Sequence, residues 1–128
     1  MPARPEQFRP VYQYVTVGGR PQEVELFDEE LWNERGIVYA RVFQEEIVYI
    51  RSTESRLCDR IQEHFRIIWT ADYSEYREWA EGKRIMIFAY KPPLIEVLGR
   101  LISIHRTLEN ALIAEFRPRF AVPFSRSC

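Results

Sequence analysis

Tyrosines and arginines that can handle a phosphate group recur at matched spacing in the middle of this sequence. Tyr39 and Arg41 stand two residues apart, and Tyr49 and Arg51 repeat that spacing further along. A packed sheet face does not need phenols beside guanidiniums, whereas a guanidinium forks onto phosphate oxygens. The pattern therefore indicates phosphate chemistry. Further candidates follow along the chain: Arg60, His64 and Glu109.

The segment 36–51 has to position these tyrosines and arginines. Its apolar and polar residues alternate, which predicts two half-buried strands with residues 44–46 as the turn. Successive side chains of a strand point to opposite faces. One face is then expected to carry Ile37, Tyr39, Arg41, Phe43, Ile47, Tyr49 and Arg51. The other face is expected to carry Val38, Ala40, Val42, Val48 and Ile50.

The spacing after this hairpin predicts a helix that runs to about residue 69. An apolar stripe recurs at helical intervals and consists of Leu57, Ile61, Phe65 and Ile68. Arg56, Arg60 and His64 stand one turn apart on a neighbouring stripe. Ser55 or Thr53 is the expected N-cap.

The segments on either side predict further strands and short helices. Strands are expected over 11–17, 23–27 and 84–90, with a glycine turn at 18–19. Asp28 is expected to cap a short helix, and a second short helix over 73–80 ends at Gly82.

The last third of the chain is less regular. Residues 94–106 fit either a helix or a strand. An apolar stripe over 108–116 then predicts a helix, with Thr107 as its cap and Pro118 at its end.

The hairpin and helix motifs resemble the GIY-YIG nuclease family, and they are most similar to its small phage endonuclease II branch. The first triplet corresponds to Gly36-Ile37-Val38-Tyr39 and the second to Tyr49-Ile50-Arg51. Arg60 and His64 match the pair on the helix. The distal motif corresponds to residues 109–113 followed by 116–121, so the resemblance covers 36 to 121.

Three positions depart from the family pattern. Either Val38 or Tyr39 is the counterpart of the first tyrosine, and the alternation favours Tyr39 because Val38 suits the core face. Arg51 replaces the glycine of the second triplet, and Ala121 stands at the expected asparagine position. Ala121 is either native, in a weakened or differently organised protein, or an engineered inactivating substitution.

The resemblance implies an α/β nuclease fold with a central antiparallel β-sheet flanked by helices. Residues 1–35 would form an N-terminal hairpin extension, 36–121 the nuclease core and 122–128 a tail. The implied activity is hydrolysis of phosphodiester bonds in double-stranded DNA by a restriction-type or phage-type endonuclease that depends on Mg²⁺ or Mn²⁺. The implied catalytic residues are Tyr39, Tyr49, Arg60, His64 and Glu109.

Each implied role has a chemical basis. Glu109 would be the metal ligand, rather than a solvated carboxylate at a helix start. Arg60 would contact the scissile phosphate. Tyr39 and Tyr49 would orient or deprotonate the attacking water, rather than form an aromatic cross-strand pair; a free phenol titrates near pH 10, so a base role needs help. His64 would relay a proton, bind phosphate, or pack beside the next ring. Contacts to the DNA backbone are expected from Arg41, Arg51, Arg56, Arg117 and Arg119.

Length and composition limit the class of protein. A chain of 128 residues with 46% hydrophobic residues is one domain with a modest core. The net charge of −1 is not that of an indiscriminate nucleic-acid binder, although all but two of the 18 basic residues are arginine. There is no membrane-spanning apolar run, and the two cysteines favour a reducing, cytoplasmic location.

Two other functions stay open at this point. A catalytically inactive DNA-binding protein on the same fold would explain Arg51 and Ala121. An unrelated interaction module would use the acidic N-terminal hairpin as a binding edge. For the endonuclease, cutting both strands calls for two copies or two encounters, so a homodimer or tetramer is expected.

Overall fold

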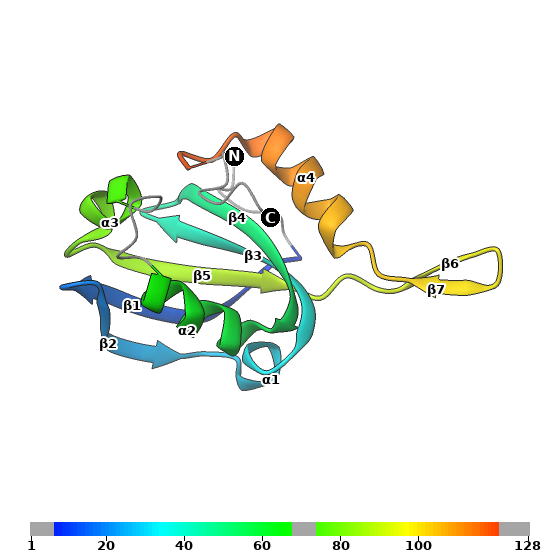
Figure 1. The fold of residues 1–128 in the computed structure, drawn as a ribbon, viewed down its shortest axis with the longest axis horizontal. Helices are drawn as coiled ribbons and strands as arrows, with labels where there is room; N and C mark the ends of the chain where they lie inside the picture. Colours follow the sequence, from blue (N-terminus) through cyan, green and yellow to red (C-terminus); the bar gives the residue numbers. More distant parts are fainter. Residues whose placement is uncertain (1–6, 68–73, 121–128) are drawn as a thin grey trace.

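A five-stranded antiparallel sheet forms the centre of the protein in a computed structural model that describes residues 7–67 and 74–120 (Figure 1). The order across the sheet is β2-β1-β5-β3-β4. Its strands are β1 Arg9–Val17, β2 Arg20–Leu26, β3 Arg35–Phe43, β4 Glu46–Arg56 and β5 Arg84–Tyr90. The helices are α1 Glu29–Trp32, α2 Leu57–Ile67, α3 Ser74–Ala80 and α4 His105–Phe116. The expected antiparallel sheet flanked by helices is confirmed.

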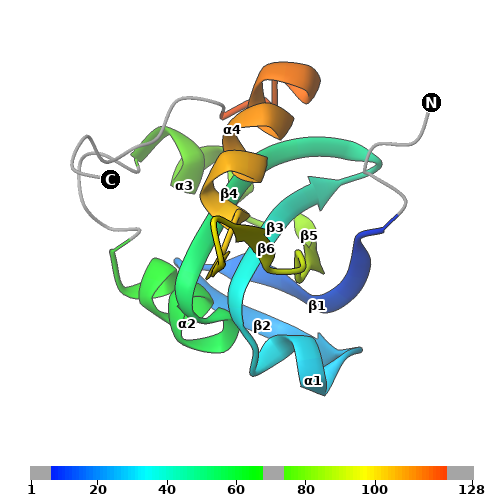
Figure 2. The same ribbon diagram turned by 90° about the vertical axis from the view of Figure 1, so that its right-hand side faces the viewer.

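Helices cover both faces of this sheet and create two separate cores. Leu57 and Ile61 of α2 pack on one face against β1, β3 and β5, together with Leu31 of α1. Leu112 of α4 packs on the other face against Val38 and neighbouring residues of β3, β4 and β5. Figure 2 shows α2 and α4 on opposite sides of the strands. The sheet therefore separates two apolar layers, and its β4 edge is reached by helices from both.

The β3–β4 hairpin has the register that the sequence pattern predicts. Tyr39 lies opposite Arg51, and Arg41 lies opposite Tyr49. A turn at 44–45 joins the strands, and both of its residues have positive φ, at 50° and 68°. Paired positive φ values are typical of a type I′ turn, whose twist matches that of the flanking strands. The hairpin thus places two tyrosines and two arginines on one face of the sheet.

A β-bulge changes one of the predicted faces. Arg41 pairs with Tyr49 but Val42 pairs with Ile47, so Val48 is an extra residue on β4. An extra residue reverses the alternation that precedes it. Ile47 consequently packs in the α4 core, and its predicted place beside Tyr49 is wrong. The carbonyl of Val48 accepts a hydrogen bond from Phe120 N at 2.8 Å, which ties the segment after α4 to the bulge.

Gly36 begins the hairpin in a conformation that a side chain would strain. Its φ is +67°, and the register of the two strands shifts between Arg35 and Ile37. A Cβ at this position would lie 3.2 Å from the ammonium group of Lys91, which itself donates to Arg35 O. The glycine of the first triplet is therefore explained by backbone geometry.

The other predicted elements are mostly confirmed. The N-terminal hairpin is present as β1 and β2 and extends the sheet next to β5. Asp28 caps α1 by accepting a hydrogen bond from Leu31 N at 3.0 Å. α3, β5 and the end of α4 before Pro118 also lie close to their expected positions.

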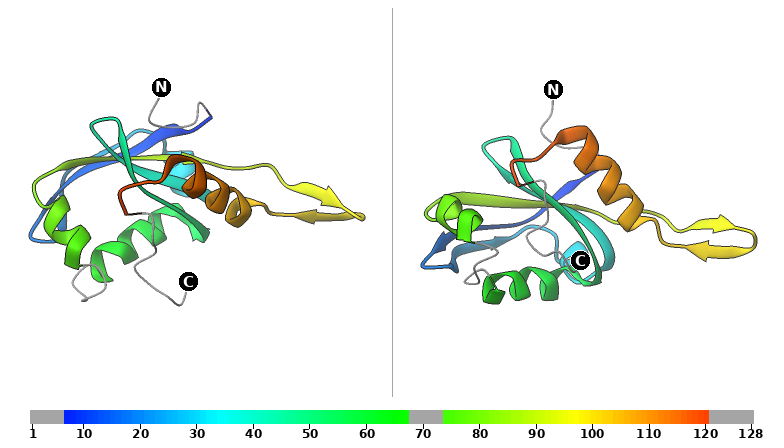
Figure 3. Two further views of the ribbon diagram at one scale, coloured as in Figure 1. Left: turned by 90° about the horizontal axis from the view of Figure 1, so that it is seen from above. Right: turned by 45° about the horizontal axis from the view of Figure 1, so that its top comes forward.

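In the last third of the chain, the structure resolves one open prediction and corrects another. The ambiguous region 94–106 contains a hairpin of β6 Ile95–Val97 and β7 Arg100–Ile102, which projects from the body (Figure 3). Thr107 is not the cap of α4, because the helix begins at His105 after an N-cap residue, Ile104, that makes no side-chain capping bond. Within the described residues, no helix is both long and apolar enough to cross a membrane.

Val38 provides a test of the hairpin register, because its side chain is fully buried in the α4 core. We expect Val38→Tyr to lower the free energy of unfolding by about 1–3 kcal/mol, since a larger side chain overpacks that layer. Chemical denaturation would measure the loss. Val24→Tyr on the exposed face of β2 is the matched control and should change stability little. A tolerated Tyr at position 38 would contradict the register.

Candidate active site

A polar pocket of about 530 Å³ opens where the end of β4 meets the first turns of α2 and α4. Its walls carry cations, carboxylates and hydroxyl groups together. The lining residues are Arg51, Ser52, Thr53, Glu54, Ser55, Arg60, Arg106, Glu109 and Asn110. We refer to this hollow as the polar pocket. It contains three of the residues expected from the sequence, namely Arg51, Arg60 and Glu109.

Glu109 lies at the junction between α4 and the edge strand β4. Its Oε2 is 3.4 Å from Arg51 Nε, and Ser52 Oγ donates to its Oε1 at 2.5 Å. The carboxylate side chain is only 12% exposed. It is therefore not a solvated carboxylate at a helix start, but a mostly buried group with a cation and a hydroxyl beside it.

Arg60 projects from the first turns of α2 into the same pocket. Its guanidinium pairs with Glu63 at 2.9 Å, and its side chain is 20% exposed. Burial acts to lower the pKa of Arg60, but Tyr39, Glu63 and Tyr49 outweigh it and the pKa is raised. Tyr39 contributes both by charge and by a hydrogen bond. Tyr39 is only 1% exposed, so its phenol contacts Arg60 on the side that faces the protein interior.

Arg41 forms a buried cationic centre behind the pocket. Its side chain is 0% exposed, and its Nε donates to the hydroxyl of Tyr14 at 3.2 Å. The guanidinium carbon lies over the rings of Tyr49, Tyr39 and Tyr76, at 5.0, 5.7 and 5.9 Å from their centroids. Among the described residues, no acceptor hydrogen-bonds to Nη1 or Nη2. The charge is stabilised by aromatic faces, each worth about 0.5–2 kcal/mol.

Four tyrosines raise the pKa of this guanidinium above its ordinary value. Burial favours a lower pKa for Arg41, but Tyr14, Tyr76, Tyr39 and Tyr49 together raise it. Arg41 is consequently a permanent cation in the core. The expectation that Arg41 contacts DNA directly is wrong, because no part of its side chain reaches the surface.

His64 sits in the same aromatic layer rather than in the pocket. It is 2% exposed and packs edge-on against Tyr76, Phe65 and Tyr49, with ring centroids 5.4, 5.9 and 6.1 Å apart. Burial lowers its pKa well below 6.5, and the neighbouring charges of Arg41, Arg60 and Arg51 lower it further. The imidazole is therefore neutral at physiological pH.

The structure brings the five predicted catalytic residues together but in two layers. Arg60 and Glu109 line the polar pocket, while Tyr39, Tyr49 and His64 are buried behind it. Such a buried layer suits residues that orient others.

The predicted DNA contacts are more dispersed. Arg51 lines the pocket, whereas Arg56 ends β4 and pairs with Asp59 at 3.0 Å. Arg117 is exposed after α4, and Arg119 pairs with Glu46 at the far end of β4. Ala121 lies outside the described residues.

Sequence reasoning missed several members of this site. Ser52 and Arg106 line the pocket, and Tyr14 and Tyr76 surround Arg41. Ser52 directly follows the second triplet, which is a local signal that the sequence offers. Tyr14 and Tyr76 come from β1 and α3, and only the fold brings these distant elements to Arg41.

A divalent metal ion would depend mainly on Glu109. Among the described residues, no group of three or more His, Cys, Asp or Glu side chains is arranged to hold a metal ion. The pocket instead offers one mostly buried carboxylate among hydroxyl oxygens. Mg²⁺ keeps several waters and needs only one or two carboxylates when a substrate phosphate completes its shell. The donor set therefore fits such an ion.

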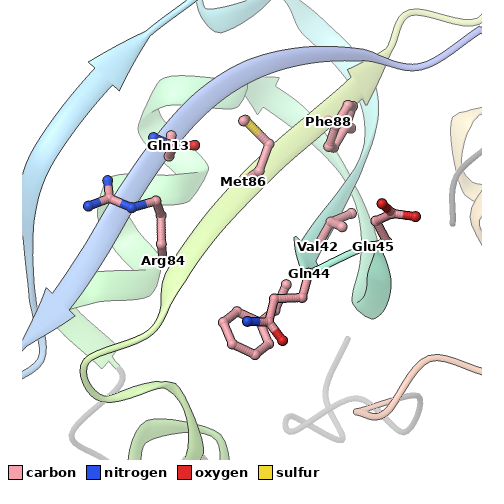
Figure 4. A pocket seen from close by; sticks show the side chains of 8 residues that line it. Gln13, Val42, Gln44, Glu45, Arg84, Met86 and Phe88 are labelled. Carbon is pink, nitrogen blue, oxygen red and sulfur yellow. The ribbon is translucent and has the colours of Figure 1, made fainter.

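A second hollow lies on the α4 side of the sheet, away from these groups. It is lined mainly by Val42, Phe43, Met86 and Phe88, with a volume of about 420 Å³. Figure 4 shows Met86 and Phe88 along β5, and the polar groups of Gln13, Gln44, Glu45 and Arg84 around them. None of the predicted catalytic residues lines it, so we assign the chemistry to the polar pocket.

Comparisons with known proteins show a likeness of fold. No family model matches the sequence, and no curated protein matches it. A solved structure of a mutant of EndoII from bacteriophage T4 superposes with a TM-score of 0.65 at 20% identity, over 90% of this chain and 92% of that one. The restriction endonuclease HPY188I in complex with product DNA gives a TM-score of 0.55 at 17% identity, over 96% and 80% of the two chains.

The buried His64 predicts a loss of stability in mild acid. Its folded pKa lies well below 6.5, so the unfolded chain binds the proton first as the pH falls. The contribution of His64 to the free energy of unfolding is complete at a pH above the pKa that the histidine has in the unfolded chain. It declines below about pH 6.5, by at most about 1.4 kcal/mol per pH unit.

Denaturation of the wild type and of His64→Gln between about pH 7 and pH 5 would measure this contribution. The difference in free energy of unfolding between the two proteins should shrink as the pH falls, because glutamine does not titrate. Parallel curves would contradict a depressed pKa at His64.

Proposed function

We propose that this protein is a divalent-metal-dependent DNA endonuclease of the GIY-YIG type, which hydrolyses phosphodiester bonds in the polar pocket. The observation that carries the proposal is the meeting of Arg51 and Arg60 with Glu109 in one hollow. Two guanidiniums supply the charge that a phosphodiester needs, and the carboxylate supplies the ligand that a metal ion needs.

Arg60 and Arg51 are the proposed phosphate-binding groups. Arg60 lies on a helix, and the buried phenol of Tyr39 forms a hydrogen bond with its guanidinium. We assign Tyr39 as a positioning residue for Arg60, since its buried phenol does not line the pocket. Arg106 at the pocket rim pairs with Glu54 at 3.6 Å, and both side chains are well exposed. That exposed pair is free to exchange for a phosphate of the backbone.

Glu109 is the proposed metal ligand, and Mg²⁺ or Mn²⁺ is the proposed ion. When bound, the ion would lower the pKa of a coordinated water and offset negative charge on the phosphate. Ser52 holds one carboxylate oxygen of Glu109 by a hydrogen bond and so fixes its orientation. His64 is neutral beside Tyr49, so it adds no charge to the arginine layer.

Double-stranded DNA is the proposed substrate. The fold likeness to a restriction endonuclease that was solved with product DNA supports this choice. The sequence motifs around Tyr39, Tyr49 and Arg60 support the same family on independent grounds. Cleavage of both strands then calls for two copies or two encounters, and a homodimer is the simplest assembly that supplies two copies.

One observation favours a second function, a DNA-binding protein without catalytic activity. Arg51 stands where the family keeps a glycine, and its guanidinium lies 3.4 Å from Glu109. A resident cation at this carboxylate competes with a metal ion. The two functions differ in whether the polar pocket turns over bound DNA.

Glu109→Gln tests the endonuclease function directly. We expect the single-turnover cleavage rate of plasmid DNA with Mg²⁺ or Mn²⁺ to fall at least about a hundredfold, because the amide removes the anionic ligand. DNA binding measured in EDTA should persist. Glu115→Gln, an exposed position on the same helix, is the matched control and should cleave normally.

The outcomes of this assay separate the two functions. Cleavage that survives in Glu109→Gln would remove Glu109 from the metal site. Binding of duplex DNA by the wild type without any cleavage in either metal would support the inactive DNA-binding protein. Absence of both binding and cleavage would reject the proposed substrate.

Arg60→Lys tests the phosphate contact. Lysine keeps the charge but cannot fork onto two phosphate oxygens, so we expect the single-turnover rate to fall by about a hundredfold. Arg66→Lys on the exposed side of α2 provides the comparison and should retain activity. A loss below about threefold at position 60 would exclude Arg60 from transition-state stabilisation.

A further inference from the structure

Both oxygens of the Glu109 carboxylate are engaged in this structure. Oε2 lies 3.4 Å from Arg51 Nε, and Oε1 accepts a hydrogen bond from Ser52 Oγ. Arg51 and Ser52 belong to β4 and Glu109 to α4, which packs beside that strand (Figure 1). A metal ion that binds Glu109 therefore has to share the carboxylate with Arg51 or displace that guanidinium.

Sharing the carboxylate between a metal ion and Arg51 is unfavourable. The side chains of Arg51 and Glu109 are only 9% and 12% exposed, so water and salt screen the repulsion between two cations poorly. Arg60 lines the same pocket, and the buried Arg41 lies behind it. Among the described residues, no group of three or more His, Cys, Asp or Glu side chains could hold the ion instead. The protein without a further anion is therefore expected to bind a divalent ion weakly.

Displacement of Arg51 is also unfavourable unless another cation takes its place. A mostly buried carboxylate that loses its partner is left uncompensated, and removal of one member of a buried ion pair is strongly destabilising. The Arg106–Glu54 pair at the pocket rim is different, since its side chains are 73% and 74% exposed and water replaces either partner. At Glu109, the departure of Arg51 and the arrival of a metal ion are thus tied to each other.

A DNA phosphate supplies the anion that Arg51 needs when it leaves Glu109. A guanidinium forks onto two phosphate oxygens. The 3.4 Å between Arg51 Nε and Glu109 Oε2 exceeds the roughly 2.7–2.9 Å of a tight charge-assisted hydrogen bond, so this pair is open to exchange. The guanidinium carbon of Arg51 also lies 5.9 Å from the centre of the Tyr49 ring, which stabilises the cation whichever anion it contacts.

We propose that Arg51 couples metal binding to DNA binding, a role that rests on the proposed endonuclease function. In the free protein, Arg51 pairs with Glu109 and keeps divalent ions away. A bound phosphate draws the guanidinium from Oε2 while Ser52 continues to hold Oε1, so one oriented oxygen is open to the ion. By reciprocity, the ion strengthens DNA binding by the same factor. An arginine in place of the family's glycine thus restricts the loaded metal site to the DNA complex.

Binding of Mn²⁺ to the protein without DNA tests the first part of the coupling, with electron paramagnetic resonance of the free ion as the measurement. Arg51→Gln removes the charge, so we expect its Mn²⁺ dissociation constant to be at least about tenfold lower than that of the wild type. Arg51→Lys keeps the cation and should bind Mn²⁺ as weakly as the wild type. Arg84→Gln is the matched control, because it removes the arginine of an exposed glutamate pair outside the polar pocket, and it should also match the wild type.

A duplex with a phosphorothioate at every linkage, which resists cleavage, tests the second part. Only the Mn²⁺ that is lost in Glu109→Gln is counted, since DNA phosphates bind the ion by themselves. Saturating duplex should tighten this binding in both the wild type and Arg51→Gln, because a phosphate oxygen completes the shell of the ion. The gain should be at least about tenfold larger in the wild type, where the duplex also draws Arg51 from the carboxylate.

Three results would overturn the coupling and leave the proposed endonuclease function intact. They are equal Mn²⁺ affinities of the wild type and Arg51→Gln without DNA, an equal gain from the duplex in both, and tight Mn²⁺ binding by Arg51→Lys without DNA. If Glu109→Gln binds as much Mn²⁺ as the wild type in the presence of duplex, Glu109 is not the metal ligand and both proposals fail. Arg51→Met is also uncharged, and it repeats the comparison if thermal unfolding shows that the glutamine variant does not fold.

Discussion

The pairing register of β3 and β4 is the constraint on which the rest of this structure depends. Tyr39 opposite Arg51 and Arg41 opposite Tyr49 place four polar groups on the α2 face, while Val38 and Ile50 remain in the α4 core. A shift of one residue would exchange the two faces and bury the wrong set on each side. The two-residue turn and the bulge at Val48 fix that register at one end, and the glycine at position 36 fixes it at the other.

Given this register, the protein accepts a fully buried cation. Arg41 has aromatic rings where most buried arginines have a carboxylate, and Tyr14, Tyr49 and Tyr76 come from three separate elements to provide them. The charge of Arg41 adds to that of Arg60 and Arg51 in front of it, and it helps to keep His64 neutral. A positive layer behind a polar pocket favours an anionic ligand at its mouth, which is consistent with a phosphodiester substrate.

The polar pocket and the β6–β7 hairpin both adjoin the start of α4. Glu109 reaches the polar pocket from this helix, and the β6–β7 hairpin returns to the body just before its first residue, His105. The same helix therefore anchors the projecting hairpin and places the proposed metal ligand.

The sequence by itself determined the strand alternation, the shared face of the tyrosines and arginines, and the helices that carry Arg60 and Glu109. These follow from local periodicity, which short-range sterics impose on any chain. It did not determine that Arg41 is buried, that Ile47 changes face, or that residues 94–102 leave the body. Burial of Arg41 depends on rings from β1 and α3, and the bulge depends on strand pairing. The projection of the β6–β7 hairpin depends on where β5 ends and where α4 begins. Only the tertiary structure decides these, because each arises from contacts between residues far apart along the chain.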